Sequence, residues 1–318
     1  MRGLAAAVVW VVALRPAAPS PTDAIGRDVG MDRSQRVPEH EGARIMRDAE
    51  DGRPEHLYFA ALLYLYGKGG VAESPAEAVR NFRLAAEKGH AGAMVALGAL
   101  LRHGRGVARD EKAAFAWVSE AARRDHVDAL WMLGVARLEG WGGDVDHGAA
   151  RTWLHKAAGL GSADAFHWLG VMAEYGLGRD GPDLNEALES YRAAAAKGHD
   201  AANFHLGLAY AYGRGANQDL GRAMLLFQEG AQRRHGGSMY YIGLMTLYGH
   251  GVPVDYDVAR YWFQRAESAN DAAFGDLASN ARRELEASLQ MAETFIAEAE
   301  ANWTSANEPP EGLKYNTA

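Results

Sequence analysis

A glycine turn that recurs about every 36 residues is the feature that most constrains how this chain can fold. A glycine loop that cradles a phosphate is expected once per nucleotide site, whereas one copy in every unit of a fixed period is typical of a structural turn. The sequence therefore predicts a repeat architecture. The leading glycines, separated by 37, 36, 36, 37 and 36 residues, are Gly67, Gly104, Gly140, Gly176, Gly213 and Gly249.

Each repeat is predicted to hold two helices, one on either side of the turn. An apolar segment such as AMVALGALL precedes the turn, and a residue that can cap a helix N-terminus follows it. One helix pair cannot bury its own apolar face, whereas stacked pairs can. We therefore expect an all-α protein, a right-handed α-solenoid superhelix of stacked antiparallel helix pairs. The predicted capping residues are Ser74, Asp110, Asp146, Asp183, Asp219 and Asp255.

The repeat pattern also predicts the organisation of the chain. Segments before and after the repeats have the helical spacing of caps that cover the ends of a stack. The outermost segments are rich in proline, serine and charge, which is typical of disorder. The predicted parts are a signal peptide (1–20), a disordered linker (21–40), an N-terminal capping helix (41–53), six repeats within 54–271 (54–90, 91–126, 127–162, 163–199, 200–235 and 236–271), a C-terminal capping helix (272–303) and a disordered tail (304–318).

Charge and composition exclude several classes of function. The formal net charge is −8 and the basic residues are scattered, so no basic patch for a nucleic acid is expected. The chain has no cysteine, which excludes disulfides, thiolate metal sites and a cysteine nucleophile.

The N-terminus predicts export. Arg2 is followed by an apolar run over 4–14, which fits the apolar core of a secretory signal peptide. A stable membrane span needs about 20 apolar residues, so none is predicted. We expect the protein in a periplasm or a secretory-pathway lumen. The alternative is a cytoplasmic protein in which the apolar run is not a signal.

No catalytic residue, metal site or cofactor is predicted. The serines lack a Gly-x-Ser-x-Gly context, and no His-x-x-x-His pair with a nearby glutamate occurs. Polar residues that converge in one repeat and break its pattern would indicate an enzyme, and we identify none from the sequence. Four histidines occupy equivalent positions between repeats, as a solvated or capping row: His90, His126, His199 and His235.

These recurring residues resemble the Sel-one-like repeat (SLR) family, a relative of the tetratricopeptide repeat. The resemblance covers about two thirds of the chain. It is illustrated by the second repeat, which matches the family pattern at Ala93, Leu97, Gly98, Gly104, Gly106, Val107, Asp110, Ala114, Trp117, Ala121 and Ala122.

The resemblance implies an α-solenoid that acts as an adaptor for other proteins, in bacterial envelope regulation or assembly or in endoplasmic-reticulum quality control. Some cysteine-rich bacterial members resemble β-lactam binders or hydrolases. Because this chain has none of their cysteines, that function does not carry over to it. A hydrolase or a small-ligand binder on the same scaffold stays as the alternative function.

In related solenoids the first helix of each repeat lines the concave surface. Three successive positions of that helix are mostly apolar here, and three residues span about 200° of a helix, so one row is expected to face the groove. We expect a monomer that binds another protein or peptide there, because aromatic residues and methionine suit such a surface. The alternative is that stacking buries all three rows. The predicted groove residues are Phe59, Met132, Trp168, His205 and Tyr241.

Overall fold

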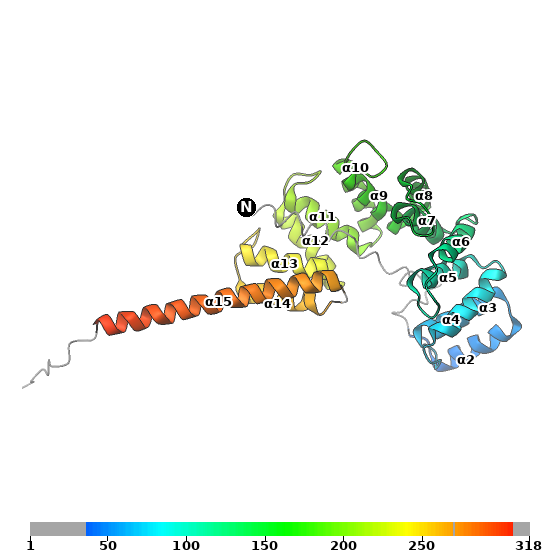
Figure 1. Cartoon of the computed structure of the whole chain (residues 1–318), viewed down its shortest axis with the longest axis horizontal. Helices are drawn as coiled ribbons and strands as arrows, with labels where there is room; N and C mark the ends of the chain where they lie inside the picture. Colours follow the sequence, from blue (N-terminus) through cyan, green and yellow to red (C-terminus); the bar gives the residue numbers. More distant parts are fainter. Residues whose placement is uncertain (1–35, 270, 308–318) are drawn as a thin grey trace, which may run out of the picture. The chain divides into compact units, whose positions relative to one another are not determined.

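The computed structural model describes residues 36–269 and 271–307, and within these ranges it contains helices and turns but no strand (Figure 1). The predicted all-α class is confirmed. The elements, which include one 3₁₀ helix (η3), are α2 (Glu39–Asp48), η3 (Ala49–Asp51), α3 (Pro54–Tyr66), α4 (Pro75–Glu87), α5 (Ala91–His103), α6 (Glu111–Ala122), α7 (Val127–Glu139), α8 (His147–Gly159), α9 (Ala163–Tyr175), α10 (Leu184–Ala196), α11 (Asp200–Tyr212), α12 (Leu220–Gln232), α13 (Gly236–Tyr248), α14 (Tyr256–Glu267) and α15 (Ala272–Asn307).

The helices form two compact units that divide between Asp219 and Leu220. The first unit contains α2 to α11 and the second contains α12 to α15. Within each unit every helix packs against the helix before it and the helix after it, as α3 packs on α4 and α4 on α5. The predicted α-solenoid of stacked helix pairs is confirmed. The division falls inside the fifth repeat, between its first and second helices.

The leading glycine of each turn ends the first helix of its repeat. All six leading glycines are left-handed, with φ between 61° and 76°, and each follows the last residue of its helix. Glycine has no Cβ, so it adopts this conformation without strain. The prediction that the recurring loop is a structural turn is confirmed.

The second glycine of the turn touches the preceding repeat. A Cβ placed on Gly106, whose φ is 75°, would lie 2.4 Å from the carbonyl carbon and oxygen of Pro75, the first residue of α4. A Cβ placed on Gly215 would likewise lie 2.4 Å from the carbonyl oxygen of Leu184, the first residue of α10. The two glycines therefore have different functions, because the first ends a helix and the second lets successive repeats approach closely.

Side-chain caps begin most of the helices. Asp110 accepts a hydrogen bond from the backbone N–H of Ala113 at 2.9 Å, and Asp146 accepts one from Ala149 at 2.8 Å. Such a bond satisfies one of the unpaired N–H groups of a helix start. Five of the six predicted caps are observed to make it: Ser74, Asp110, Asp146, Asp183 and Asp255.

Three of the four histidines between repeats cap the helix that follows them. His90, His199 and His235 each accept, through Nδ1, the backbone N–H three residues further on. His126 occupies the same position before α7 but makes no side-chain cap bond. A ring nitrogen that accepts a hydrogen bond carries no proton, so the cap bond requires the form in which Nδ1 is free of hydrogen.

Two helices flank the repeats. Helix α2 packs on α3, and it begins at Glu39, two residues inside the predicted linker, directly after Pro38. Helix α15 runs to Asn307, so residues 304–307 are helical and not part of a disordered tail. The sequence explains this extension, because no glycine or proline occurs between 276 and 308. The predicted signal peptide lies outside the described residues. None of the described helices combines the length and the apolar character needed to cross a membrane.

Candidate partner-binding site

The structure places the predicted groove residues in two different environments. Met132, Trp168 and His205 lie in the interior, with 1%, 4% and 4% of their surface exposed. Phe59 and Tyr241 are half-buried. The reason is that the first helix of a repeat is enclosed by its own second helix and by both neighbouring repeats. In α5, for example, every residue from Gly92 to Leu101 is buried. The groove assignment is therefore corrected for the first three residues, which belong to the core.

A cluster of buried polar side chains lies between the fourth and fifth repeats, and its members include His167, Glu174 and His205 at positions that are mostly apolar in the other repeats. His167 is fully buried, and its ring stacks on that of His199 with centroids 4.5 Å apart. His205 stacks in the same way on Tyr191, at 4.7 Å and with an interplanar angle of 12°. The two stacks touch, because the His167 and His205 ring centroids are 5.2 Å apart.

Glu174 holds one side of this buried cluster. It accepts a hydrogen bond from the Tyr191 hydroxyl at 2.7 Å and forms an ion pair with Arg214 at 2.8 Å. Burial alone would raise the pKa of Glu174, but His205, Tyr191 and Arg214 outweigh it and hold that pKa below its ordinary value. Burial, and then the charge of Glu174, raise the pKa of Tyr191 well above its ordinary value. The carboxyl group is therefore ionised and the phenol remains a donor.

A second carboxylate, Asp164, lies on the other side of the buried cluster. Its Oδ1 is 3.6 Å from Nε2 of His199, and both side chains are about nine-tenths buried. Within the described residues, no three His, Asp or Glu side chains are arranged to hold a metal ion. The groups of this cluster are directed at one another in the interior, so the arrangement fits a structural role between two repeats.

The expectation that no polar residues converge was wrong for these two repeats. The signal was available in the sequence, because aligned repeats show the substitutions directly. His167 stands where the other repeats have Tyr58, Val95, Trp131, Phe204 and Tyr240. Glu174 stands where they have Leu65, Arg102, Leu138, Ala211 and Leu247.

A group of exposed apolar side chains surrounds the turn of the sixth repeat and the start of α14. Its members, between 40% and 63% exposed, are Tyr248, Val254, Tyr256, Val258 and Tyr261. We call these five residues the sixth-repeat patch. These large exposed apolar side chains lie close together in the sequence rather than occurring singly, and exposed apolar residues in such numbers favour an interaction surface.

Arg265 orders the edge of the sixth-repeat patch. Its guanidinium donates a hydrogen bond to the Tyr261 hydroxyl at 3.1 Å and lies 5.4 Å from the ring centroid of Trp262. The Tyr261 and Trp262 rings are themselves in edge contact at 5.4 Å. Tyrosine, tryptophan and arginine are the residue types that most often dominate binding energy at protein interfaces. Here the three side chains contact one another in a single arrangement, and side chains ordered in this way lose less entropy when a surface is covered.

Comparison with known families identifies the repeat. The Sel1 repeat model matches residues 55–90, 91–126, 127–162, 163–199, 200–235 and 237–271. The chain belongs to the Sel1 repeat family. No curated protein matches it.

Solved structures of Sel1 repeat proteins are similar to this chain. A Sel1 repeat protein from Oxalobacter formigenes is 25% identical, with a TM-score of 0.66, and the match covers 79% of this chain and 97% of that one. A protective antigen of uropathogenic Escherichia coli that displays an SLR fold is 28% identical, with a TM-score of 0.57. That match covers 70% of this chain but 48% of the antigen, so the chain spans about half of its length. The APC/C hetero-tetramer Cut9–Hcn1 shares the fold alone, at 16% identity and a TM-score of 0.54, over 76% of this chain and 46% of that one.

Comparison of the six Sel1 repeats shows what is particular to the sixth. Tyr261 occupies a position on the outer face of the second helix that is mostly polar or small elsewhere. The equivalent residues are Arg80, Ala116, Thr152, Glu189 and Leu225. The aromatic character of this face therefore does not follow from the Sel1 repeat pattern, which leaves the position free to vary.

Proposed function

We propose that this Sel1 repeat protein is a non-enzymatic adaptor that binds another protein, with the sixth-repeat patch as its main contact. The observation that carries the proposal is the concentration of five exposed large apolar side chains between Tyr248 and Tyr261. Sel1 repeat scaffolds in general serve protein interactions. The competing location is the predicted groove, of whose predicted residues Phe59 in the first unit and Tyr241 in the second are half-buried.

Truncation of the patch is expected to abolish partner capture. In a crosslinking pull-down from the native host, the double variant Tyr256→Ala/Tyr261→Ala should recover the specific partner at least tenfold less well than the unmodified protein, because exposed aromatic anchors are worth about 2 kcal/mol or more each when buried by a partner. Both side chains are about half exposed and lie outside the core, so the thermal unfolding curve should change little.

The matched control is Val145→Ala/Leu160→Ala, which removes two exposed apolar side chains from the first unit. It should capture the partner normally. Equal capture by the patch variant and the control would rule out the sixth-repeat patch. Loss of capture in Phe59→Ala/Tyr241→Ala alone would place the contact in the groove instead.

We further propose that the adaptor acts in an exported compartment, a periplasm or a secretory-pathway lumen. The support is the run from Arg2 through the apolar residues 4–14, which has the form of a signal peptide. N-terminal sequencing of the mature protein from its host should find a start near residue 20. Protein that retains Met1 and fractionates with the cytosol would exclude export.

A further inference from the structure

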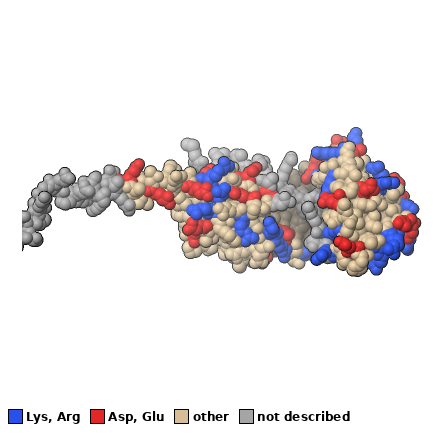
Figure 2. Space-filling model, turned by 90° about the horizontal axis from the view of Figure 1, so that it is seen from below, with Lys and Arg blue, Asp and Glu red and all other residues tan. Residues whose placement is uncertain are grey.

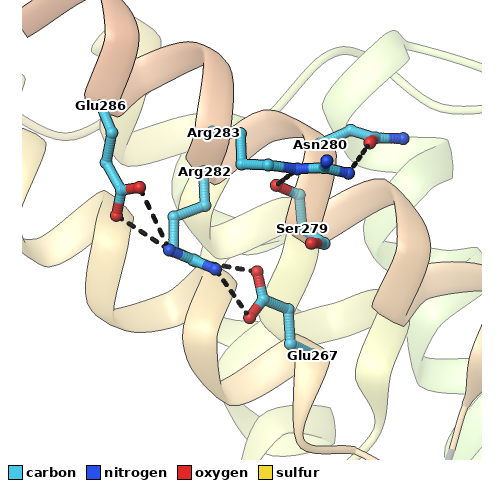
Figure 3. Close-up of polar contacts among 6 residues, drawn as sticks. All are labelled: Glu267, Ser279, Asn280, Arg282, Arg283 and Glu286. Atoms are coloured by element: carbon cyan, nitrogen blue, oxygen red, sulfur yellow. Dashed lines mark hydrogen bonds and ion pairs between the residues drawn. The ribbon is translucent and has the colours of Figure 1, made fainter.

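Helix α15 begins as a cover for the last repeat. Phe274, Ala278 and Leu285 are buried, and the helix packs on α13 and α14. Arg282 fixes its direction, as Figure 3 shows: Nε donates to Glu267 of α14 at 2.8 Å, and Nη1 donates to Glu286 of α15 itself at 2.9 Å. The first part of α15 is thus packed firmly on α13 and α14 within the second unit.

The same apolar face continues beyond the part of α15 that packs. Leu285, Leu289, Ala292 and Ile296 are spaced by four, three and four residues, which is the a/d spacing of a coiled-coil seam. Yet every residue from 290 to 298 is exposed. Ile296 is 56% exposed, Phe295 beside it is 73% exposed, and Met291 is 66% exposed. The face that packs on the repeats therefore ends in solvent with large apolar side chains uncovered.

Acidic residues border this face. Between 284 and 298 the chain has four glutamates and no lysine or arginine: Glu284, Glu286, Glu293 and Glu298. Glu286 and Glu293 follow seam positions directly, at the e positions of the heptad, where charge selects the partner helix. In Figure 2 the coloured part of α15 that extends beyond the repeats shows red and tan.

We propose that the apolar face of α15 formed by the half-buried Leu289 and the exposed Ala292, Phe295 and Ile296 binds a basic amphipathic helix of a partner protein. Lysine or arginine beside the partner's apolar seam would pair with Glu293 first, because Arg282 of the same helix already contacts the Glu286 carboxylate. A second copy of this chain fits poorly. In an antiparallel pair of α15 helices the e positions of the two copies face each other, so glutamate would oppose glutamate. In a parallel pair Glu293 would face a g position of the other copy, such as the uncharged Ser288. The inference rests on the proposed adaptor function but on different residues from the sixth-repeat patch.

The test uses the full chain and two synthetic helical peptides of about three heptads, with leucine at a and d in both. One peptide has lysine at its e and g positions and the other has glutamate. By fluorescence anisotropy at moderate salt, the lysine peptide should bind at least tenfold more tightly than the glutamate peptide. Phe295→Ser/Ile296→Ser should weaken lysine-peptide binding at least tenfold. Glu293→Lys, which leaves the Arg282–Glu286 contact in place, should abolish the preference for the lysine peptide.

Tyr256→Ala/Tyr261→Ala is the matched control and should leave peptide binding unchanged, so a failure of the sixth-repeat patch and a failure of this inference are distinguishable. Equal binding of the two peptides, or lysine-peptide binding that survives Phe295→Ser/Ile296→Ser with normal helicity by circular dichroism, would overturn the proposal. So would a dimer in sedimentation experiments that the same double variant dissociates, because the occupant would then be a second copy.

Discussion

Gly106→Ala is expected to lower the free energy of unfolding of the first unit by roughly 2–5 kcal/mol, although it adds a single methyl group in a surface turn. Two costs combine. A residue with a Cβ pays about 1–2 kcal/mol to adopt the left-handed conformation that Gly106 has at φ 75°. The new Cβ would also lie 2.4 Å from the backbone of Pro75, so the second repeat must shift away from the first. Forced displacement of this kind costs about 1–3 kcal/mol.

Gly89→Ala separates these two costs. Gly89 is also left-handed, with φ 94°, but a Cβ there would have no neighbour within 4 Å. The Gly89→Ala variant should therefore lose only the conformational part of the free energy of unfolding, about 1–2 kcal/mol. Urea unfolding followed by circular dichroism measures both variants against the unmodified protein. Equal losses would show that the second glycine of the turn has no special contact with the preceding repeat.

The predictable part of this fold consists of local rules repeated six times. Helix pairs, turns and caps follow from residues within one repeat, such as the Asp110 side chain and the N–H it accepts three residues later. Each rule could be checked against five other copies in the same chain. That is why the helix positions were predicted closely, and why the ends of the flanking helices α2 and α15, which have no second copy, were less accurate.

The contacts between repeats could not be predicted in the same way. A helical wheel shows that three rows of the first helix are apolar, but not how many neighbours surround it. The enclosure of Met132 and Trp168 depends on how closely successive pairs pack, which the small second glycine permits. The period of the repeat carries no information on the distance between successive helix pairs. The sequence therefore does not distinguish the core residues of the first helix from its groove residues.

The buried polar cluster was missed for another reason. Agreement between repeats indicates the fold, whereas the polar residues of this cluster occupy positions at which the repeats differ. Glu174, Tyr191 and His205 lie on three different helices, and only their packing brings them into contact. Polar substitutions at several core positions of adjacent repeats are a signal that the sequence contained.

Glu174→Gln is expected to lower the free energy of unfolding of the first unit by about 3 kcal/mol at neutral pH. The side chain is 10% exposed and is the shared acceptor for Tyr191 and Arg214. Removal of one charge from a buried pair costs about 3–5 kcal/mol, because the remaining charge loses its partner, and the part-exposed guanidinium of Arg214 places this case at the lower end. Glu73→Gln is the matched control. Glu73 pairs with Arg105, which occupies the position of Arg214 in another repeat, but its side chain is 53% exposed. It should cost at most about 1 kcal/mol.

The loss caused by Glu174→Gln should also depend on pH, in a direction that its surroundings determine. The native structure holds the pKa of Glu174 below its ordinary value of 4.5, so the unfolded chain takes up this proton first as the pH falls. The carboxylate therefore stabilises the fold fully above its ordinary pKa, and its contribution disappears as the pH falls through the native pKa. The difference between unmodified protein and variant, measured by urea unfolding with hydrogen exchange of α9 and α11, should be largest at neutral pH and should shrink below pH 4.5. A difference that stays constant as the pH falls would mean that the glutamine disturbs packing, and that the charge of Glu174 does not hold the fourth and fifth repeats together.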